Sequence, residues 1–394
     1  ENATDALRAV TDRAREGAVT FLIPKLEAGM KLTQTPVFYN PQMELSRDLA
    51  VLALAAYGMT KQEISVCEPM AGCGVRGIRF AAEVESVGSV LMSDINPAAA
   101  RLAQENVRLN KLSEKVRVET QEANLLLSAH SAPHTRFDVI DVDPFGSPAP
   151  YLDSAVRAVN DGGLIALTAT DMAPLCGVHP EACVRKYGGK PLRSEYCHEV
   201  AVRLVLGALA GTAARHDRGI QAVFSHSTDH YIRTYAIIRR GAKVANKSAA
   251  ARGFILHCFH CFHRETVRGI TALLRRTCPE CGGTLNIAGP VWLDPLYDRQ
   301  FCSDMNSLAE RVRSQQMRRL RRILTTVTNE STDSTYYVID RMCDSLGVPT
   351  GSRDAVVKRL TEQGYSATPT HFNPRGVRTN APAMVVRRVL TGQP

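Results

Sequence analysis

The sequence has no run of the roughly 18–20 uncharged apolar residues that are needed to span a bilayer. It has no internal repeat and no low-complexity segment, and residues 1–17 are charged where a secretory signal would be apolar. These absences argue against a membrane protein, a collagen-like fibre and a long disordered tail. The 394 residues are 44% hydrophobic and 22% charged, which is typical of a globular protein of two or three domains. We expect it to act in the cytoplasm.

The net charge of +9 comes from the C-terminal part of the chain. Residues 1–240 carry 26 Lys and Arg against 27 Asp and Glu, whereas residues 241–394 carry 22 against 12. This asymmetry indicates a polyanionic partner such as a nucleic acid, because each neutralised phosphate releases a counterion. The alternative is that the charge only serves solubility.

Between residues 64 and 170, short β-rich segments alternate with helical patterns. The predicted strands are 64–67, 89–93, 116–119, 137–142 and 163–169. A helix is predicted from Asn96-Pro97, where Asn can cap the first turn, to about residue 110. Alternating strands and helices form parallel sheets covered on both faces, so we predict a doubly wound α/β fold with a mainly parallel sheet.

Further elements are predicted on both sides of this region. They are helices over 43–57 and 195–214 and a strand pair over 219–227 and 231–239 that extends the sheet. Residues 243–252 are expected to form a linker, which divides the chain into domains 1–242 and 243–394.

The second domain contains an arginine-rich segment, predicted as one helix over 303–328. Six arginines and no acid lie between Arg311 and Arg322. Helical spacing places Arg311, Arg318 and Arg322 on one face, and Arg313 and Arg321 less closely on it. The candidate RNA-binding residues are Arg311, Arg318, Arg319 and Arg322. We expect these side chains to contact phosphates, although a charged face can also be merely solvated. Helices over 335–346 and 353–364 and a strand over 383–390 would complete a winged-helix-like module.

Four of the eleven cysteines form two CxxC pairs, Cys258/Cys261 and Cys278/Cys281, sixteen residues apart. Four thiolates at this spacing predict a tetrahedral Zn²⁺ site with no open position, hence a structural one. A redox role is disfavoured, because no thioredoxin-like context surrounds either pair. The other seven cysteines are expected to be small buried hydrophobic residues: Cys67, Cys73, Cys176, Cys183, Cys197, Cys302 and Cys343.

A glycine-rich loop follows the first predicted strand. Gly72, Gly74 and Gly77 spell GxGxxG, and Asp94 follows twenty residues after Gly74. This pattern fits both NAD and S-adenosylmethionine (SAM), and an acid at the end of the first strand favours SAM, whose amino acid end is cationic. Glu68 occupies that position.

Two more acids follow the second and third strands. Asp94 could accept hydrogen bonds from both ribose hydroxyls, and Glu122 with the N–H of Ala123 could bind the adenine edge. Alternatively, these acids cap helices or are surface charges.

The fourth strand delivers Asp143, Pro144, Phe145 and Gly146. Methyl transfer to an exocyclic amine needs a carboxylate that accepts a hydrogen bond from the amine, and a rigid turn that presents it. An aromatic ring such as Phe145 can stack on the base, and glycine allows close approach of the backbone. Although the same residues can form an ordinary turn, their position after three acid-ending strands favours a methyltransferase.

These residues resemble the tRNA guanine-26 N2-dimethyltransferase family over nearly the whole chain. The resemblance rests on VFYNPQMELSRD at 37–48, AGCGVRGIR at 71–79, DPFGSP at 143–148 and the cysteine pairs. It implies that Asp143 is the catalytic carboxylate, that Phe38 and Phe145 hold the guanine, and that the C-terminal part binds tRNA. It also implies SAM contacts by Arg47, Arg76, Asp94, Glu122 and Ala123. The family often has Asp where this chain has Glu122.

From the residues themselves, Phe38 could equally plug a domain edge, and Arg47 could be a solvated helix charge.

The motifs and the resemblance together predict a SAM-dependent tRNA methyltransferase that acts on guanine N2, with mono- and then dimethylation, and we favour a monomer. The alternatives are an N6-adenine methyltransferase of DNA or RNA and a non-catalytic RNA-binding protein with a vestigial SAM fold. An NAD oxidoreductase would leave the DPFG segment unexplained.

Overall fold

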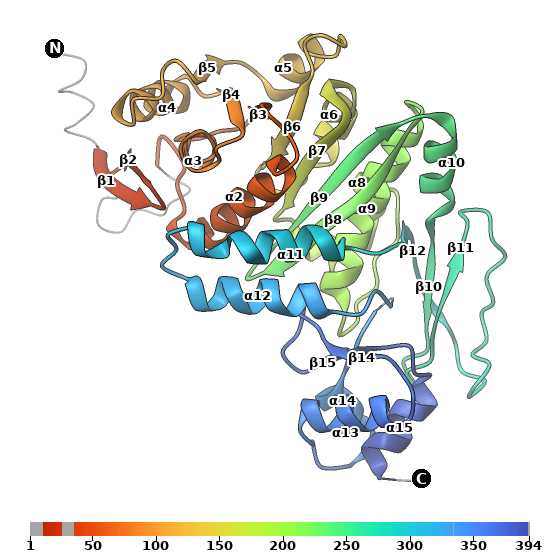
Figure 1. The fold of residues 1–394 in the computed structure, drawn as a ribbon. Helices are drawn as coiled ribbons and strands as arrows, with labels where there is room; N and C mark the ends of the chain where they lie inside the picture. The colour runs from red at the N-terminus through yellow and green to blue at the C-terminus, as the bar shows by residue number, and fades with distance from the viewer. Residues whose placement is uncertain (1–10, 26–34, 334, 393–394) are drawn as a thin grey trace. The chain divides into compact units, whose positions relative to one another are not determined.

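The computed structural model describes residues 11–25, 35–333 and 335–392 (Figure 1). The chain divides into two compact units. The first comprises Glu1–Pro144, Asp153–Leu167 and Ser303–Leu324, and the second comprises Phe145–Leu152, Thr168–Cys302 and Thr325–Pro394. Residues 1–10 of the charged N-terminal segment lie outside the described residues.

Five parallel strands form the sheet of the first unit, as predicted. They are β3 (Ile64–Glu68), β4 (Val87–Asp94), β5 (Val116–Thr120), β6 (Phe137–Val142) and β7 (Val159–Ala169). The predicted antiparallel pair is also present, as β8 (Arg218–Thr228) and β9 (Tyr231–Arg240). The strand order is β5-β4-β3-β6-β7-β9-β8, so the sheet is mixed but mainly parallel.

The 3₁₀ turn η2 (Pro41–Met43) and helix α2 (Glu44–Gly58) precede β3 in the first unit. The helices that follow the next four strands are α3 (Val75–Glu83), α4 (Pro97–Leu109), α5 (Ala123–Ala129) and α6 (Leu152–Ala158). The 3₁₀ turn η3 (Ala149–Tyr151), just before α6, belongs to the second unit. Helix α4 begins as predicted, because the Asn96 side chain accepts a hydrogen bond from the Ala98 N–H at 3.0 Å.

The structure also contains an N-terminal hairpin that was not predicted from the sequence, formed by β1 (Thr11–Glu16) and β2 (Val19–Pro24). Two asparagines of the α4 region bind its backbone. The fully buried Asn106 side chain accepts from the Leu22 N–H at 2.6 Å and donates to the Leu22 carbonyl at 3.0 Å. Asn110 pairs with Thr20 in the same way. The two side chains thus satisfy backbone groups that a third strand would otherwise satisfy.

The second unit contains α7 (Met172–Leu175), α8 (Pro180–Tyr187), α9 (Cys197–Ala214) and α10 (Ala242–Ala250). The linker predicted over 243–252 is wrong, because α10 occupies most of it and its alanine-rich sequence has a high helix propensity. Helix α9 is long and apolar enough to cross a membrane by length and composition alone. Most of it is buried inside the protein, as in the core helix of a globular domain.

The remainder of the second unit carries two small sheets. The first is antiparallel, with the order β11-β10-β12: β10 (Arg252–His257), β11 (Arg264–Arg268) and β12 (Asn286–Trp292). The C-terminal elements are β13 (Tyr337–Val338), α13 (Ile339–Leu346), α14 (Arg353–Glu362), β14 (Ala367–Pro369), β15 (Gly376–Thr379) and α15 (Ala383–Thr391). The two helices predicted here are confirmed. The strand predicted over 383–390 is wrong: it is helix α15, with Ala383, Val386 and Val389 buried at helical spacing.

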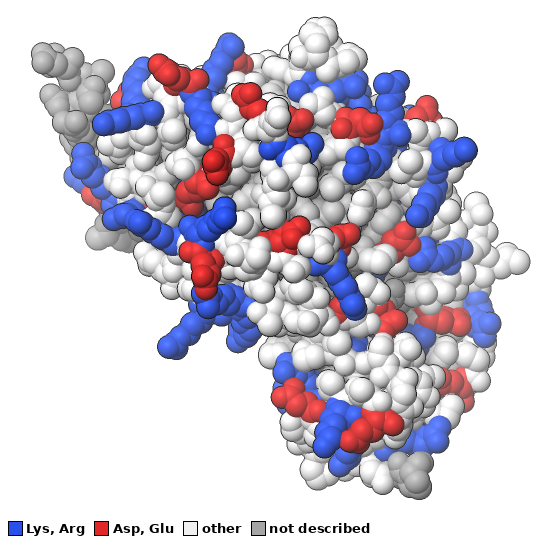
Figure 2. Space-filling model, viewed as in Figure 1, with Lys and Arg blue, Asp and Glu red and all other residues white. Residues whose placement is uncertain are grey.

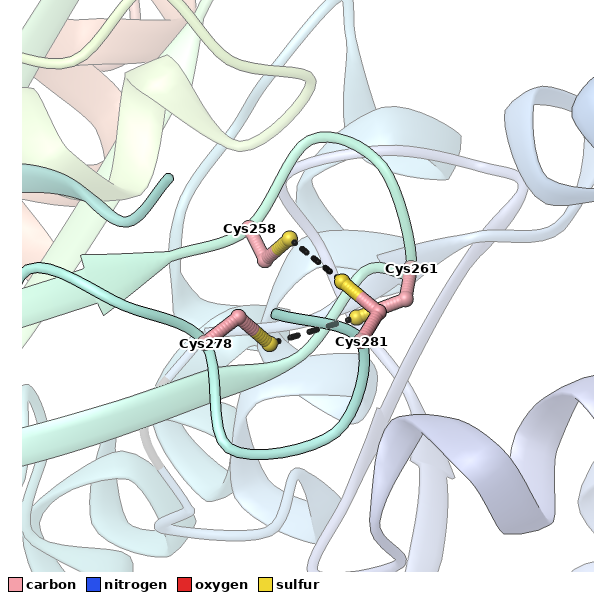
Figure 3. Close-up of side chains that lie close together, drawn as sticks. All are labelled: Cys258, Cys261, Cys278 and Cys281. Carbon is pink, nitrogen blue, oxygen red and sulfur yellow. Dashed lines mark hydrogen bonds between the residues drawn. The ribbon is translucent and has the colours of Figure 1, made fainter. Parts of the chain in front are cut away.

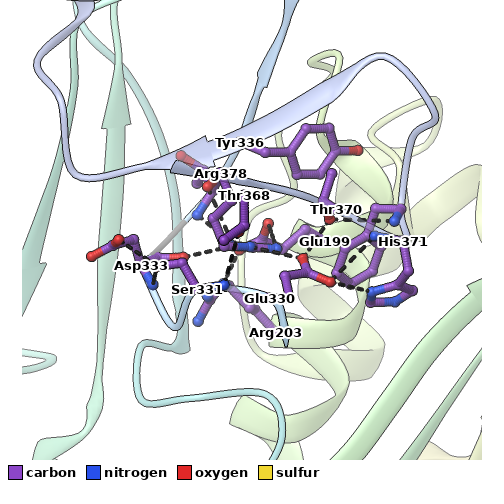
Figure 4. A network of polar contacts seen from close by, with 12 residues as sticks. Glu199, Arg203, Glu330, Ser331, Asp333, Tyr336, Thr368, Thr370, His371 and Arg378 are labelled. Carbon is purple, nitrogen blue, oxygen red and sulfur yellow. Dashed lines mark hydrogen bonds and ion pairs between the residues drawn. The ribbon is translucent and has the colours of Figure 1, made fainter. Parts of the chain in front are cut away.

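A buried ion network connects α9 to β15 and to the segment before β13 (Figure 4). Arg378 donates from Nε to Glu330 at 2.8 Å, and its Nη2 lies 2.9 Å from Glu199. Glu199 also pairs with Arg203 at 2.8 Å, and Glu330 with His371 at 2.8 Å. All of these carboxylate and guanidinium groups are excluded from solvent, so the ion pairs with its partners must replace the hydration that each charge loses.

Candidate active site

The glycine loop between β3 and α3 brings the backbone close to two acids. Gly74 has φ +80°, a left-handed conformation that glycine adopts without strain. A Cβ atom on Gly77 would lie 2.7 Å from Glu68 Oε2, so only glycine allows this approach. The N–H of Gly72 donates to Asp94 Oδ2 at 2.9 Å. The loop is therefore shaped by its contacts with Glu68 and Asp94.

Glu68 lies at the carboxyl end of β3 and is almost completely buried. Its Oε2 accepts a hydrogen bond from the Gly77 N–H at 2.8 Å. Burial raises the pKa of Glu68 to about 8, with a further contribution from Asp141 and Asp143, although Arg76 opposes the shift. A cation beside this carboxyl group would favour its ionised form.

Arg76 lies among three carboxylates at the ends of β3 and β6. Its Nη2 donates to Asp143 Oδ2, and its Nε lies 3.8 Å from Glu68 and 4.0 Å from Asp141. Arg76 thus pairs with Asp143 and lies beside Glu68. Asp141 was missed, although its position two residues before Asp143 places both side chains on one side of the strand.

The acids after β4 and β5 both bind backbone N–H groups. Asp94 accepts from Gly72 through Oδ2 and from Asn96 through Oδ1, each at 2.9 Å. Glu122 caps α5 by accepting from the Leu125 N–H at 2.9 Å, and Ala123 is the buried first residue of that helix. The capping alternative therefore describes the observed contact of Glu122.

Arg47 is buried and has a partner that the sequence reading missed. Its Nε donates to Glu16 Oε2 at 2.6 Å, and its Nη2 donates to the Asn40 carbonyl at 3.0 Å. The Tyr39 hydroxyl donates to Glu16 Oε1 at 2.7 Å. Burial alone would raise the pKa of Glu16, but Arg47 and Tyr39 lower it overall. The interpretation of Arg47 as a solvated helix charge is therefore wrong.

Phe38 lies next to the glycine loop. A Cβ atom on Gly72 would be 3.3 Å from the Phe38 carbonyl oxygen. Asn96 donates from Nδ2 to the Pro36 carbonyl at 2.8 Å, which fixes the same segment to the end of β4. The structure thus places the Phe38 backbone near the loop predicted to bind the cofactor.

The residues after Asp143 form a well-braced turn. Pro144 is buried, whereas Phe145 is 77% exposed. The Gly146 N–H donates to Thr170 Oγ1 at 2.8 Å, and the Ser147 hydroxyl donates to the Tyr187 hydroxyl at 2.8 Å. These contacts fix the backbone on both sides of an aromatic ring that faces outward.

The four CxxC cysteines form a compact cluster at the loops of the β10–β12 sheet (Figure 3). Their sulfur atoms all lie within 4.8 Å of one another. The distance between the two Sγ atoms is 3.5 Å in the Cys258–Cys281 pair and 3.5 Å in the Cys261–Cys278 pair. Four sulfurs at this spacing fit a tetrahedral Zn²⁺ site. The nearby His263 instead pairs with Glu280 at 2.9 Å.

The arginine-rich segment is not one helix. It is split into α11 (Arg299–Leu308), the 3₁₀ turn η4 (Ala309–Arg311) and α12 (Met317–Asn329). The break occurs where Val312 is extended and Ser314 Oγ accepts from the Gln316 N–H at 3.0 Å. The predicted common face of Arg311 with Arg318 and Arg322 is therefore wrong.

Arg318, Arg319 and Arg322 do share α12, and Arg318 and Arg322 lie one turn apart and exposed. Its other face is apolar, with Leu320, Leu324 and Val327 fully buried. Figure 2 shows Lys and Arg side chains gathered near the turn that joins α11 and α12, while acidic and basic side chains alternate over much of the same face.

Comparisons with known proteins agree over nearly the whole chain. A family model described as "N2,N2-dimethylguanosine tRNA methyltransferase" matches residues 17–391. The tRNA (guanine(26)-N(2))-dimethyltransferase of Methanothermobacter thermautotrophicus is 38% identical over 379 residues, 96% of this chain and 98% of that one. The tRNA (guanine(26)-N(2)/guanine(27)-N(2))-dimethyltransferase of Aquifex aeolicus is 33% identical over 371 residues, 93% and 92% of the two chains.

A solved structure is similar as well. The complex of Trm1 from Pyrococcus horikoshii with S-adenosyl-L-methionine superposes with a TM-score of 0.86 at 33% identity, covering 96% of this chain and 99% of that chain.

Proposed function

Because the chain belongs to the N2,N2-dimethylguanosine tRNA methyltransferase family, whose model covers residues 17–391, we propose that it methylates the N2 of a guanine in tRNA with SAM as donor. The guanine is at position 26, and the amine receives one and then a second methyl group. The observation that carries this proposal is the family match over nearly the whole chain. The juxtaposition of Asp143, Arg76 and Glu68 at the strand ends supports it.

The residues around the glycine loop fit SAM. Burial raises the pKa of Glu68 to about 8 although Arg76 opposes the shift, so a further cation such as the amino group of the cofactor would favour the ionised form. The carboxylate oxygens of Asp94 each have a further lone pair for ribose hydroxyls. Glu122 and Ala123 would contact adenine, the backbone of Gly72 and Gly74 would line the site, and Arg47 and Arg76 would support the amino acid end.

Bound SAM supplies a methyl group activated by its sulfonium. Asp143 accepts a hydrogen bond from the guanine amine, orients the nitrogen toward that methyl, and takes up the proton that the nitrogen loses. Arg76 pairs with Asp143 and holds its carboxylate in place. Pro144 stiffens the turn, and Phe145 and Phe38 stack on the base. Gly146 has φ +82° and a Cβ there would meet nothing within 4 Å, which leaves space for the monomethylated amine.

The direct test is incubation with unmodified tRNA and labelled SAM, followed by digestion to nucleosides. We expect N2,N2-dimethylguanosine, lost when G26 is replaced by A and retained when G27 is replaced. Label in N6-methyladenosine would favour the adenine alternative. No product despite SAM binding by calorimetry would favour the non-catalytic alternative.

The pH dependence of SAM binding tests the role of Glu68. Because its pKa is raised to about 8 without the cofactor, the group is mostly protonated at pH 6–7.5 and must lose its proton to pair with a cation. We expect SAM affinity to fall roughly tenfold per pH unit below 8. Calorimetry in buffers of different ionisation enthalpy should show proton release. Glu68→Gln should weaken binding and remove the slope, whereas Glu105→Gln on α4 should change neither; an unchanged slope in Glu68→Gln would contradict this role.

We propose residues 243–394 as a basic tRNA-binding domain with a winged-helix-like C-terminal module, and residues 1–242 as the catalytic domain. We also propose that the protein acts as a cytoplasmic monomer.

The tRNA contacts of α12 can be measured by salt dependence. Replacing Arg318 and Arg322 by Gln should lower tRNA affinity and reduce the slope of log affinity against log salt by about one per arginine lost from a phosphate. Fluorescence anisotropy over a salt series measures both quantities. Arg117→Gln, at a side chain 79% exposed in β5, is the matched control. Equal slopes for the double variant and the wild type would exclude phosphate contacts by this helix.

We propose that the four-cysteine cluster binds a structural Zn²⁺. Cys278→Ser removes one of its four sulfurs and should release about one zinc ion per chain and lower the melting temperature. Metal analysis and thermal unfolding measure these changes. A variant that retains its full zinc content would refute this ligand set.

A further inference from the structure

Three side chains that could bind a metal ion lie close together, outside the proposed catalytic site and outside the four-cysteine cluster. Cys176 follows the C-terminal end of α7, and Cys197 and His198 are the first two residues of α9. One ligand atom from each lies within 4.8 Å of the other two. All three residues are partly exposed, so Cys176 and Cys197 are not the buried hydrophobic residues that the sequence predicts. Cys183, on α8, does fit that expectation with no exposed surface.

The backbone fixes this arrangement. Gly177, at φ +86°, packs so tightly on Arg193 that a Cβ atom there would lie 2.9 Å from the Arg193 backbone nitrogen. This contact brings the chain around Cys176 against the segment that leads into α9. The Cys176 N–H donates to the Met172 carbonyl at 2.7 Å, and the Cys197 N–H to the Ser194 carbonyl at 3.1 Å. The two cysteines thus meet because a glycine permits close approach, which their 21-residue separation does not reveal.

We propose that Cys176, Cys197 and His198 form a second metal site, which takes a thiophilic divalent ion such as Zn²⁺. Two thiolates and one imidazole are ligands that zinc prefers, and three protein ligands leave a fourth position for water. The partial exposure of all three side chains gives solvent access to that position. Binding displaces protons from the two thiols, so the site is a dithiolate when loaded.

The site lies near residues that brace the proposed catalytic turn. Helix α7 begins after Asp171, which accepts a hydrogen bond from the Tyr187 hydroxyl at 2.7 Å, and Tyr187 contacts Ser147. A metal at Cys176 would join the other end of this short helix to α9. This consequence rests on the proposed function, whereas the metal site itself does not.

Metal content tests the site in the full chain. After reduction, loading with Zn²⁺ and dialysis against a zinc buffer, the wild type should hold about two zinc ions per chain, counting the four-cysteine cluster. Cys197→Ser should hold one fewer. Cys183→Ala removes a buried thiol from the same region and should keep the wild-type content.

A spectroscopic readout separates loss of the site from loss of the fold. With ¹¹³Cd²⁺ in place of zinc, the wild type should give two resonances, and Cys197→Ser should lose one and keep that of the four-cysteine cluster. A single resonance in the wild type, or an unchanged zinc content in Cys197→Ser, would overturn the proposal. A Cys176–Cys197 disulfide that persists under reducing conditions, detected by non-reducing peptide mapping, would overturn it too.

Discussion

Replacement of Asp143 by alanine is expected to slow methyl transfer to tRNA by roughly 10²–10⁴-fold. The variant loses the carboxylate that orients the guanine amine and takes up its proton. SAM affinity should stay within a few-fold of the wild type, because Glu68 and Asp94 contact the loop independently of Asp143. Single-turnover rates with labelled SAM, followed by nucleoside digestion, measure the first effect, and calorimetry measures the second.

Asp153→Ala is the matched control for Asp143→Ala. Asp153 lies ten positions further along the chain, at the start of α6, where its 60% exposed side chain pairs with Arg157. Its removal should leave the transfer rate unchanged. Asp143→Asn keeps the size of the side chain without its charge and should also be slow, which separates loss of the carboxylate from loss of packing. Wild-type rates in Asp143→Ala would refute the mechanism.

The strand ends could be predicted because their information is local. A buried strand such as Phe137–Val142 shows its apolar residues in sequence order, and the next residue, Asp143, must stand at the edge of a parallel sheet. The capped start of α4 at Asn96 is equally local. The positions of Glu68 and Asp143 at the carboxyl ends of β3 and β6 therefore follow from the strand pattern.

Long-range partners could not be predicted in the same way. Arg47 pairs with Glu16, 31 residues away, in the β1–β2 hairpin. The alternation of polar and apolar residues in this hairpin is too weak to predict its strands from the sequence. The break before α12 depends on one serine cap within a helical pattern, and α15 is rich in valine, which favours strands by propensity. In each of these cases, a distant contact, a local cap or the spacing of buried residues decides the structure, and the types of the residues alone do not reveal it.

Replacement of Arg378 by methionine is expected to destabilise the protein by about 3–5 kcal/mol, because it leaves Glu199 and Glu330 buried without their shared cation. Urea unfolding of the full chain measures the loss. Arg375→Met, three residues away, is the control: its partly exposed pair with Asp340 should be worth less than about 1 kcal/mol. Similar losses in both variants would contradict the role of the buried network.

The pH dependence of stability gives the same network a second test. Burial would raise the pKa of Glu330, but Arg378 and His371 lower it to about 2 overall, and the pKa of Glu199 is lowered by Arg378 and Arg203. In the unfolded chain these groups bind protons near their ordinary pKa of 4.5. Their contribution to stability is therefore complete above pH 4.5 and is lost as pH falls toward 2. Since Arg378 causes much of both shifts, Arg378→Met should have a shallower loss of stability over this range than the wild type, and an equally steep loss would show that other groups produce it.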